Sequence, residues 1–142
     1  MGDSRGAAAV EFALVIIPLL LFLFGIFEFG RLLWTREALQ SAAIAGARCM
    51  GIGQTECTTS GSYDAQKTAA YISGQGVALL VPLTASNVLL DDAATCSGVG
   101  GFSEVTINFT FQTAVPQLLG ALADGIPLSA SACFPNQGNA AS

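Results

Sequence analysis

The feature that most constrains this chain is an apolar run near its N-terminus that contains a single carboxylate. Residues 12–27 are uncharged and overwhelmingly apolar, and Glu11 lies directly before them. Together with the small residues that follow Gly6, the run covers 21 positions, residues 7–27, close to the roughly 20 that a helix needs to cross a bilayer. An ionised carboxylate inside a membrane costs on the order of 2.5–3.5 kcal/mol and marks a functional residue. We therefore predict a membrane-spanning helix in which Glu11 has a function of its own.

The residues around Glu11 have the spacing of a processing site. A cut after Gly6 would give Ala7 the new α-amino group and make Glu11 the fifth residue of the mature chain. This spacing resembles that of type IV pilins, in which a glutamate at the fifth position meets the N-terminal amine of a neighbouring subunit. The resemblance implies that Gly6 and Ala7 form the processing site, and that Glu11 and Phe12 take part in subunit assembly.

A longer pattern narrows this resemblance. A glycine, a glutamate, a proline and a second glutamate follow in order at Gly6, Glu11, Pro18 and Glu28, and small residues continue the pattern over residues 38–48. These residues look like the N-terminal signature of TadE-like pseudopilins, which are minor components of the tight-adherence (Flp) pilus system. The resemblance covers roughly the first third of the chain, while the rest matches only in its pattern of elements.

One long helix is predicted over residues 7–50, between a leader peptide of residues 1–6 and a domain of residues 51–142. The helical pattern continues beyond the apolar run without a proline or a turn signal. Within the run, Pro18 has no amide proton to donate to the preceding turn, so it should kink the helix. A stripe of small residues recurs at every fourth position of the second half, at Ala38, Ala42 and Gly46. Such a stripe lets another element approach closely, either the chain's own domain or a helix of a neighbouring subunit.

The remaining residues predict a small α+β domain. Asp64 can cap a helix over residues 65–80, which Pro82 would end. Asp91 and Asp92 are expected in a solvated turn, a short helical piece is expected near residues 117–123, and the tail from residue 135 is expected to fray.

The strongest strand signal is a period-two alternation that would place Val105, Ile107, Phe109 and Phe111 inward. Three strands are predicted, over residues 86–90, 104–111 and 126–134. We therefore predict a type IV pilin-like α+β fold, in which a small antiparallel sheet packs on the projecting half of the long N-terminal helix.

Four cysteines follow the apolar run, at Cys49, Cys57, Cys96 and Cys133. An even number in a small segment beyond a membrane anchor indicates disulfide bonds in an oxidising compartment. Zinc would favour C-x-x-C pairs, whereas the gaps here are 8, 39 and 37 positions. Three pairings are possible, and we favour Cys49–Cys57 with Cys96–Cys133; free structural thiols are the alternative.

The orientation follows from the cysteines and not from the basic residues. Arg5 favours a cytoplasmic N-terminus, but Arg31 and Arg36 beyond the run make the positive-inside count ambiguous. Disulfide bonds require the far side to be oxidising. We therefore expect a single-pass protein of the bacterial inner membrane, with a cytoplasmic N-terminus and a periplasmic C-terminal domain that can be incorporated into an extracellular pilus.

Composition argues against several other functions. Residues 49–142 carry one basic and six acidic side chains, a net charge of −5, so a nucleic-acid partner is not expected. Histidine is absent, which removes the usual general base near neutral pH and the commonest metal ligand. No serine, cysteine or lysine has a plausible base partner in the sequence. We expect no enzymatic activity, no cofactor and no metal.

The leading hypothesis is therefore a minor pilin or pseudopilin that a prepilin peptidase cuts after Gly6. The resemblance implies as partners this peptidase, the inner-membrane assembly platform, the major pilin and other minor pilins. The alternative is an uncleaved single-pass anchor that displays a periplasmic binding or adaptor domain. The mass of the mature protein separates the two hypotheses.

Overall fold

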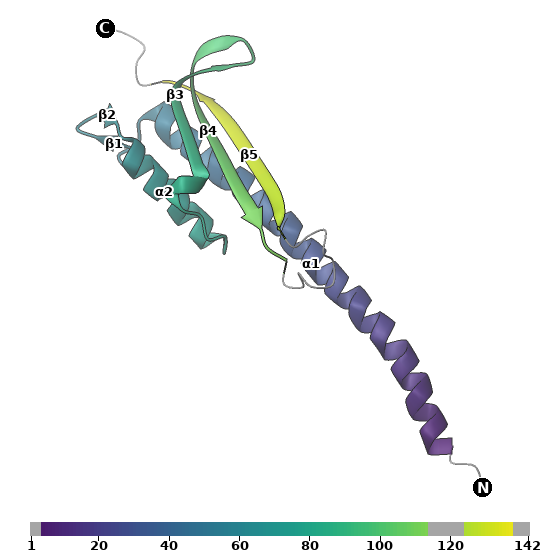
Figure 1. Ribbon diagram of the computed structural model, residues 1–142. Coiled ribbons are helices and arrows are strands. Elements are labelled where there is room, and N and C mark those ends of the chain that lie inside the picture. The colour runs from purple at the N-terminus through teal and green to yellow at the C-terminus, as the bar shows by residue number, and fades with distance from the viewer. Residues whose placement is uncertain (1–3, 114–123, 138–142) are drawn as a thin grey trace. The chain divides into compact units, whose positions relative to one another are not determined.

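The computed structural model describes residues 4–113 and 124–137. Its elements are helix α1 (Ser4–Ile52), strands β1 (Thr58–Thr59) and β2 (Ser62–Tyr63), helix α2 (Ala65–Ala78), the 3-10 helix η1 (Ala85–Asn87) and strands β3 (Val88–Cys96), β4 (Val99–Phe111) and β5 (Ile126–Pro135) (Figure 1). The chain divides into two compact units, Met1–Leu33 and Trp34–Ser142, which we call the N-terminal unit and the C-terminal unit. Helix α1 contributes residues to both.

In the N-terminal unit, α1 exposes large apolar side chains on every side. Phe12, Leu14 and Phe22, for example, are 67%, 70% and 66% exposed. Pro18 lies inside α1 and does not end it. A helix that is apolar all round is typical of a membrane span, and α1 is long and apolar enough to cross a membrane by length and composition. This agrees with the predicted span and is compatible with a single-pass membrane protein.

The C-terminal unit contains a three-stranded antiparallel sheet in the order β3-β4-β5. The central strand β4 extends the predicted strand at its N-terminal side, and its Ile107 pairs with Val88 of β3 and Ala130 of β5. Val105, Ile107 and Phe111 are buried as predicted, and Phe109 is partly buried against the core. The third predicted strand is confirmed as β5.

Strand β3 is longer than predicted, and the predicted turn at Asp91 and Asp92 is wrong. Both residues lie within β3, which continues to Cys96. The register with β4 shifts between Asp91 and Ala94, and the Asp91 carboxylate accepts a hydrogen bond of 3.0 Å from the Ala93 amide. A bulge of this kind places acidic residues within a paired strand while leaving their side chains in solvent.

The buried face of the second half of α1 consists of small side chains. Ala38 and Ala42 are 4% and 0% exposed, and Gly46 is buried. A Cβ atom added to Gly46 would lie 2.5 Å from Ile72 Cδ1 of α2 and 3.3 Å from Val105 Cγ2 of β4. The stripe therefore packs on the chain's own domain, which is one of the two arrangements expected from the sequence. Figure 1 shows this part of α1 running along the sheet with α2 beside it.

Helix α2 begins where predicted and ends earlier. The Asp64 carboxylate accepts hydrogen bonds from the Gln66 and Lys67 amides at 3.0 and 3.1 Å and from the Thr59 hydroxyl at 2.6 Å. The Thr59 hydroxyl, followed by the Lys67 amide, holds the pKa of Asp64 below its usual value. The helix ends at Ala78 rather than at residue 80, because Leu80 adopts a left-handed backbone conformation.

The segment after β5 is held in place where the structure describes it, so the predicted fraying at its start is wrong. The Asn136 amide donates to the carbonyl of Gly101 at 2.9 Å, and its side chain bonds the Ser103 hydroxyl at 2.6 Å. The Gln137 amide donates to the carbonyl of Gly51 at 2.7 Å. The helical piece predicted near residues 117–123 lies outside the described residues.

The contact at Gly46 generates a stability prediction. Gly46→Ala should lower the free energy of unfolding by about 1–3 kcal/mol, because the added methyl group overfills a buried site. Gly74→Ala is the matched control, since a Cβ atom on this α2 glycine would meet nothing within 4 Å. Because alanine favours the helix more than glycine does, this change should raise the free energy of unfolding by up to about 1 kcal/mol. Urea denaturation of the full chain in detergent measures both values, and equal stability of the two variants would contradict the packing.

Candidate processing and assembly site

The residues predicted for processing and assembly lie in the first turns of α1. Gly6 is exposed, and a Cβ atom there would meet nothing within 4 Å. Glu11 is exposed and Phe12 is 67% exposed. Gly6 and Glu11 are five residues apart on this helix, a rise of roughly 7.5 Å. Gly6, Glu11 and Phe12 are thus all exposed on α1.

The two glutamates of the N-terminal pattern differ in their partners. Glu28 forms an ion pair with Arg31, three residues further along the helix, with 2.7 Å between Glu28 Oε1 and Arg31 Nη1. Among the described side chains, none forms an ion pair or a hydrogen bond with the Glu11 carboxylate. Within the described residues, the two acids thus differ in that Glu28 is paired along the helix and Glu11 is not.

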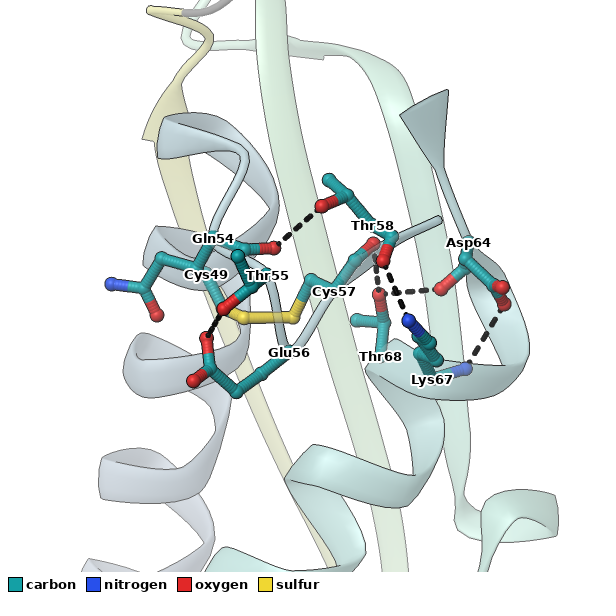
Figure 2. The surroundings of a disulfide bond; sticks show 9 residues. All are labelled: Cys49, Gln54, Thr55, Glu56, Cys57, Thr58, Asp64, Lys67 and Thr68. Atoms are coloured by element: carbon teal, nitrogen blue, oxygen red, sulfur yellow. Dashed lines mark hydrogen bonds between the residues drawn. A yellow bond between two sulfur atoms is a disulfide. The ribbon is translucent and has the colours of Figure 1, made fainter. Parts of the chain in front are cut away.

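The first disulfide bond joins the end of α1 to the segment before α2. Cys49 and Cys57 are bonded and both are 0% exposed. Figure 2 shows the surrounding hydrogen bonds, in which the Thr58 hydroxyl donates to the carbonyl of Gln54 at 3.0 Å and the Lys67 ammonium donates to the carbonyl of Thr58 at 2.9 Å. The turn between α1 and α2 is therefore held both covalently and by hydrogen bonds.

The second disulfide bond joins Cys96 at the end of β3 to Cys133 of β5. Because β4 lies between these two strands in the sheet, the bond ties the edge strands together at one end of the sheet. The structure thus confirms both favoured pairings, and no cysteine remains free.

Two residues at the surface of the C-terminal unit were not identified from the sequence. Trp34 of α1 donates a hydrogen bond from Nε1 to the carbonyl oxygen of Leu79 at 3.0 Å. Leu80, directly after it, is 87% exposed. Trp34 lies seven positions after the apolar run, and nothing in the local sequence indicated the left-handed backbone of Leu80.

A long N-terminal helix followed by a small antiparallel sheet defines an α+β fold with a pilin-like arrangement. Within this class, residues 6–48 match the family model of TadE-like proteins. The match confirms the resemblance seen in the sequence, and it is consistent with a TadE-like protein of the tight-adherence pilus system. No match was found among curated proteins or among solved structures.

The disulfide bonds predict an order of reduction. Cys133 is exposed whereas Cys49 and Cys57 are fully buried, so a mild reductant should open Cys96–Cys133 first. Loop-closure entropy for sequence separations of 8 and 37 predicts losses of about 2.5 and 4 kcal/mol on removal of the two bonds. Mass spectrometry after timed alkylation, combined with urea denaturation, measures both effects. Alkylation of all four cysteines without reductant would contradict the bonds.

Proposed function

We propose that this protein is a minor pilin or pseudopilin that acts in the assembly of a tight-adherence (Flp-type) pilus after a prepilin peptidase cuts it behind Gly6. The observation that carries the proposal is the TadE-like match, which begins at Gly6 and includes Glu11. The exposure of both residues at the start of α1 supports it.

The geometry of Gly6 suits a cleavage site. The bond between Gly6 and Ala7 lies within α1, so a peptidase has to open the first helical turn to reach its carbonyl group. Glycine lowers helix stability by about 1 kcal/mol relative to alanine, which makes this opening easier at Gly6. Its missing side chain also leaves the peptide bond open to attack.

The cut would change the electrostatic surroundings of Glu11. Once Ala7 is the first residue, Glu11 lies one turn from a positively charged amine and from the positive end of the helix dipole. An amine of an adjacent subunit at the same depth would meet the same carboxylate. In lipid both charges are desolvated, which is unfavourable, and this pairing offsets that cost. An ion pair exposed to water has no such cost to offset.

The proposed location and partners follow from this assembly role. Two disulfide bonds in the C-terminal unit support an oxidising compartment for it, which is the periplasm if α1 crosses the bacterial inner membrane. The N-terminus then faces the cytoplasm and the peptidase. The assembly platform, the major pilin and other minor pilins would contact α1 through its exposed apolar surface.

The proposal predicts a specific loss of processing in Gly6→Leu. The added side chain should block the cut, so intact-mass measurement should show the uncut precursor, whereas the native chain should begin at Ala7. Gly30→Leu is the matched control, because Gly30 also lies in α1 with nothing within 4 Å of an added Cβ atom and should be processed normally. A native chain that keeps residues 1–6 in a piliated strain would contradict the proposal and favour the uncleaved anchor.

A second prediction separates assembly from membrane insertion. Glu11→Ala removes an intramembrane charge whose insertion costs about 2.5 kcal/mol, so insertion and cleavage should persist. It also removes the proposed pairing with an amine of an adjacent subunit, and if that pairing offsets the same cost, association with other pilins should weaken roughly 60-fold. Glu28→Ala is the control, because a helical ion pair such as Glu28–Arg31 contributes only about 0.2–0.5 kcal/mol. Crosslinking yields measured alongside a membrane-fraction blot test both variants. If Glu11→Ala assembles as well as the native protein, the assigned role of Glu11 is wrong.

A further inference from the structure

A small cavity lies in the C-terminal unit where the end of α1, the hairpin of β1 and β2, the bulge of β3 and the segment after β5 come together. Its volume is about 90 Å³, which leaves room for several water-sized groups. Three glycines line the cavity, together with Met50, Thr58, Tyr63, Asp92, Ser103 and Asn136. Because segments far apart in the sequence form it, the cavity requires the folded unit.

The walls of this cavity are held in place by covalent and hydrogen bonds. The first disulfide bond joins its α1 side to the segment that leads into the hairpin. Asn136 links two strands, because its Nδ2 donates to the carbonyl of Asp92 at 2.8 Å and its Oδ1 accepts from the Ser103 hydroxyl at 2.6 Å. Two of the lining glycines, Gly53 and Gly61, are exposed and have no side chain that could close the cavity. The cavity is therefore preformed and accessible from solvent.

Asp92 is the acidic residue that lines the cavity. Among the described residues, no amide or side chain forms a hydrogen bond or an ion pair with its carboxylate. Two other acids nearby are engaged elsewhere, since the Asp91 carboxylate accepts from the Ala93 amide and the Asp64 carboxylate caps α2. Neither of them lines the cavity. Asp92 thus offers its carboxylate to a group that enters the cavity.

The electrostatic potential at the cavity wall is negative. Burial, followed by the carboxylate of Asp92, raises the pKa of Tyr63. Asp64 and Asp91 act in the same direction, so three negative charges influence this wall. Lys67 lies nearby, but its ammonium group donates to a backbone carbonyl of β1 (Figure 2), and none of the described residues that line the cavity is basic. The cavity therefore favours a cation over an anion.

The lining groups suit an ammonium group better than a metal ion. Ca²⁺ takes roughly six to eight oxygen ligands, several of them from carboxylates, whereas a single carboxylate lines this cavity. An ammonium group has three N–H donors, and the oxygens of Asp92, Tyr63 and Ser103 are available as acceptors. Ser103 is 2% exposed and gives its own proton to Asn136, so its oxygen keeps its capacity to accept. Met50 and the glycine backbone add apolar surface for a methylene stem.

From these observations we infer that the cavity binds the side-chain ammonium group of a lysine from a different protein subunit, with Asp92 as its counter-ion. Lys67 is the single lysine of this chain and is already engaged at the carbonyl of Thr58, so a second copy of the chain is not the source. The choice of a subunit as the source rests on the proposed function, in which this protein associates with other pilins. Its consequence is that the C-terminal unit takes part in assembly in addition to α1.

The first test measures whether the cavity binds a lysine side chain. Nα-acetyl-lysine methylamide is titrated at neutral pH into the full chain, with both disulfide bonds intact, in an uncharged detergent. Nα-acetyl-norleucine methylamide is the matched ligand, because it keeps most of the methylene stem and lacks the amine. We expect the lysine derivative to shift the NMR signals of the Gly53, Gly61 and Ser103 amides in a saturable way, and the norleucine derivative to leave them unchanged. Equal shifts with both ligands, or tighter binding of the corresponding arginine derivative, would overturn the inference.

Two variants show whether Asp92 is the counter-ion. Asp92→Asn keeps the shape of the side chain and removes its charge, so binding of the lysine derivative should weaken roughly fivefold. Asp91→Asn is the matched control, because it changes the net charge equally on the neighbouring residue, which does not line the cavity, and should alter binding little. Equal weakening in both variants would contradict a specific pairing. Calcium chloride that shifts the same amides at lower concentration than the lysine derivative would indicate a metal site and would also overturn the inference.

Carbodiimide coupling in piliated cells tests the source of the lysine. The reagent activates a carboxylate, and a neighbouring amine then forms an amide bond with the carboxyl carbon while one carboxylate oxygen leaves as part of a urea. We expect mass spectrometry to find Asp92 joined to a lysine of a different protein, and Asp92→Asn but not Asp91→Asn to abolish this product. If the lysine derivative binds the purified chain but no such product forms in cells that remove residues 1–6, the inference is wrong and the proposed function stands. If residues 1–6 are retained, the proposed function fails and the subunit source fails with it.

Discussion

The close contact between α1 and the rest of the C-terminal unit is the constraint on which the other features of this unit depend. At Gly46 the surface of α1 is bare backbone, and the fully buried Ile72 and Val105 pack against it. Ala42 and Ala43 extend this flat surface along the helix at 0% exposure. Because small residues allow a short distance between the elements, α2 and β4 can contact the same helix at once, and the core closes around that contact.

Much of this architecture could be predicted from the sequence because the relevant signals are local. The apolar run, the cap at Asp64 and the alternation around Ile107 each determine an element through nearest neighbours in the chain. The length of β3 could not be predicted in the same way. Its acidic residues predicted a turn, and only the pairing with β4 shows that a bulge accommodates them in a strand. The ordered tail escaped prediction for a similar reason, since Asn136 is held by partners far away in the sequence.

The N-terminal motif and the disulfide bonds could be predicted from the sequence to different extents. The motif from Gly6 to Phe12 was recognised by its spacing along the chain. The sequence predicted the helix only from residue 7, whereas α1 begins at Ser4 and includes Gly6. The disulfide pairing was favoured among three possibilities and needed the fold for its confirmation. The exposure and the left-handed backbone of Leu80 were not predicted. Both arise from how α2 ends, and no local residue pattern indicates either of them.

The disulfide bond between Cys49 and Cys57 has a mechanical consequence. A pull along α1 reaches the rest of the C-terminal unit through helix packing, through the main chain beyond Ile52, and through this bond, which bypasses the residues between Cys49 and Cys57. The bond is placed close to the C-terminal end of α1, beyond the packed stripe. A load on the end of α1 therefore passes directly to the segment before α2, and the residues between Cys49 and Cys57 are not stretched by it.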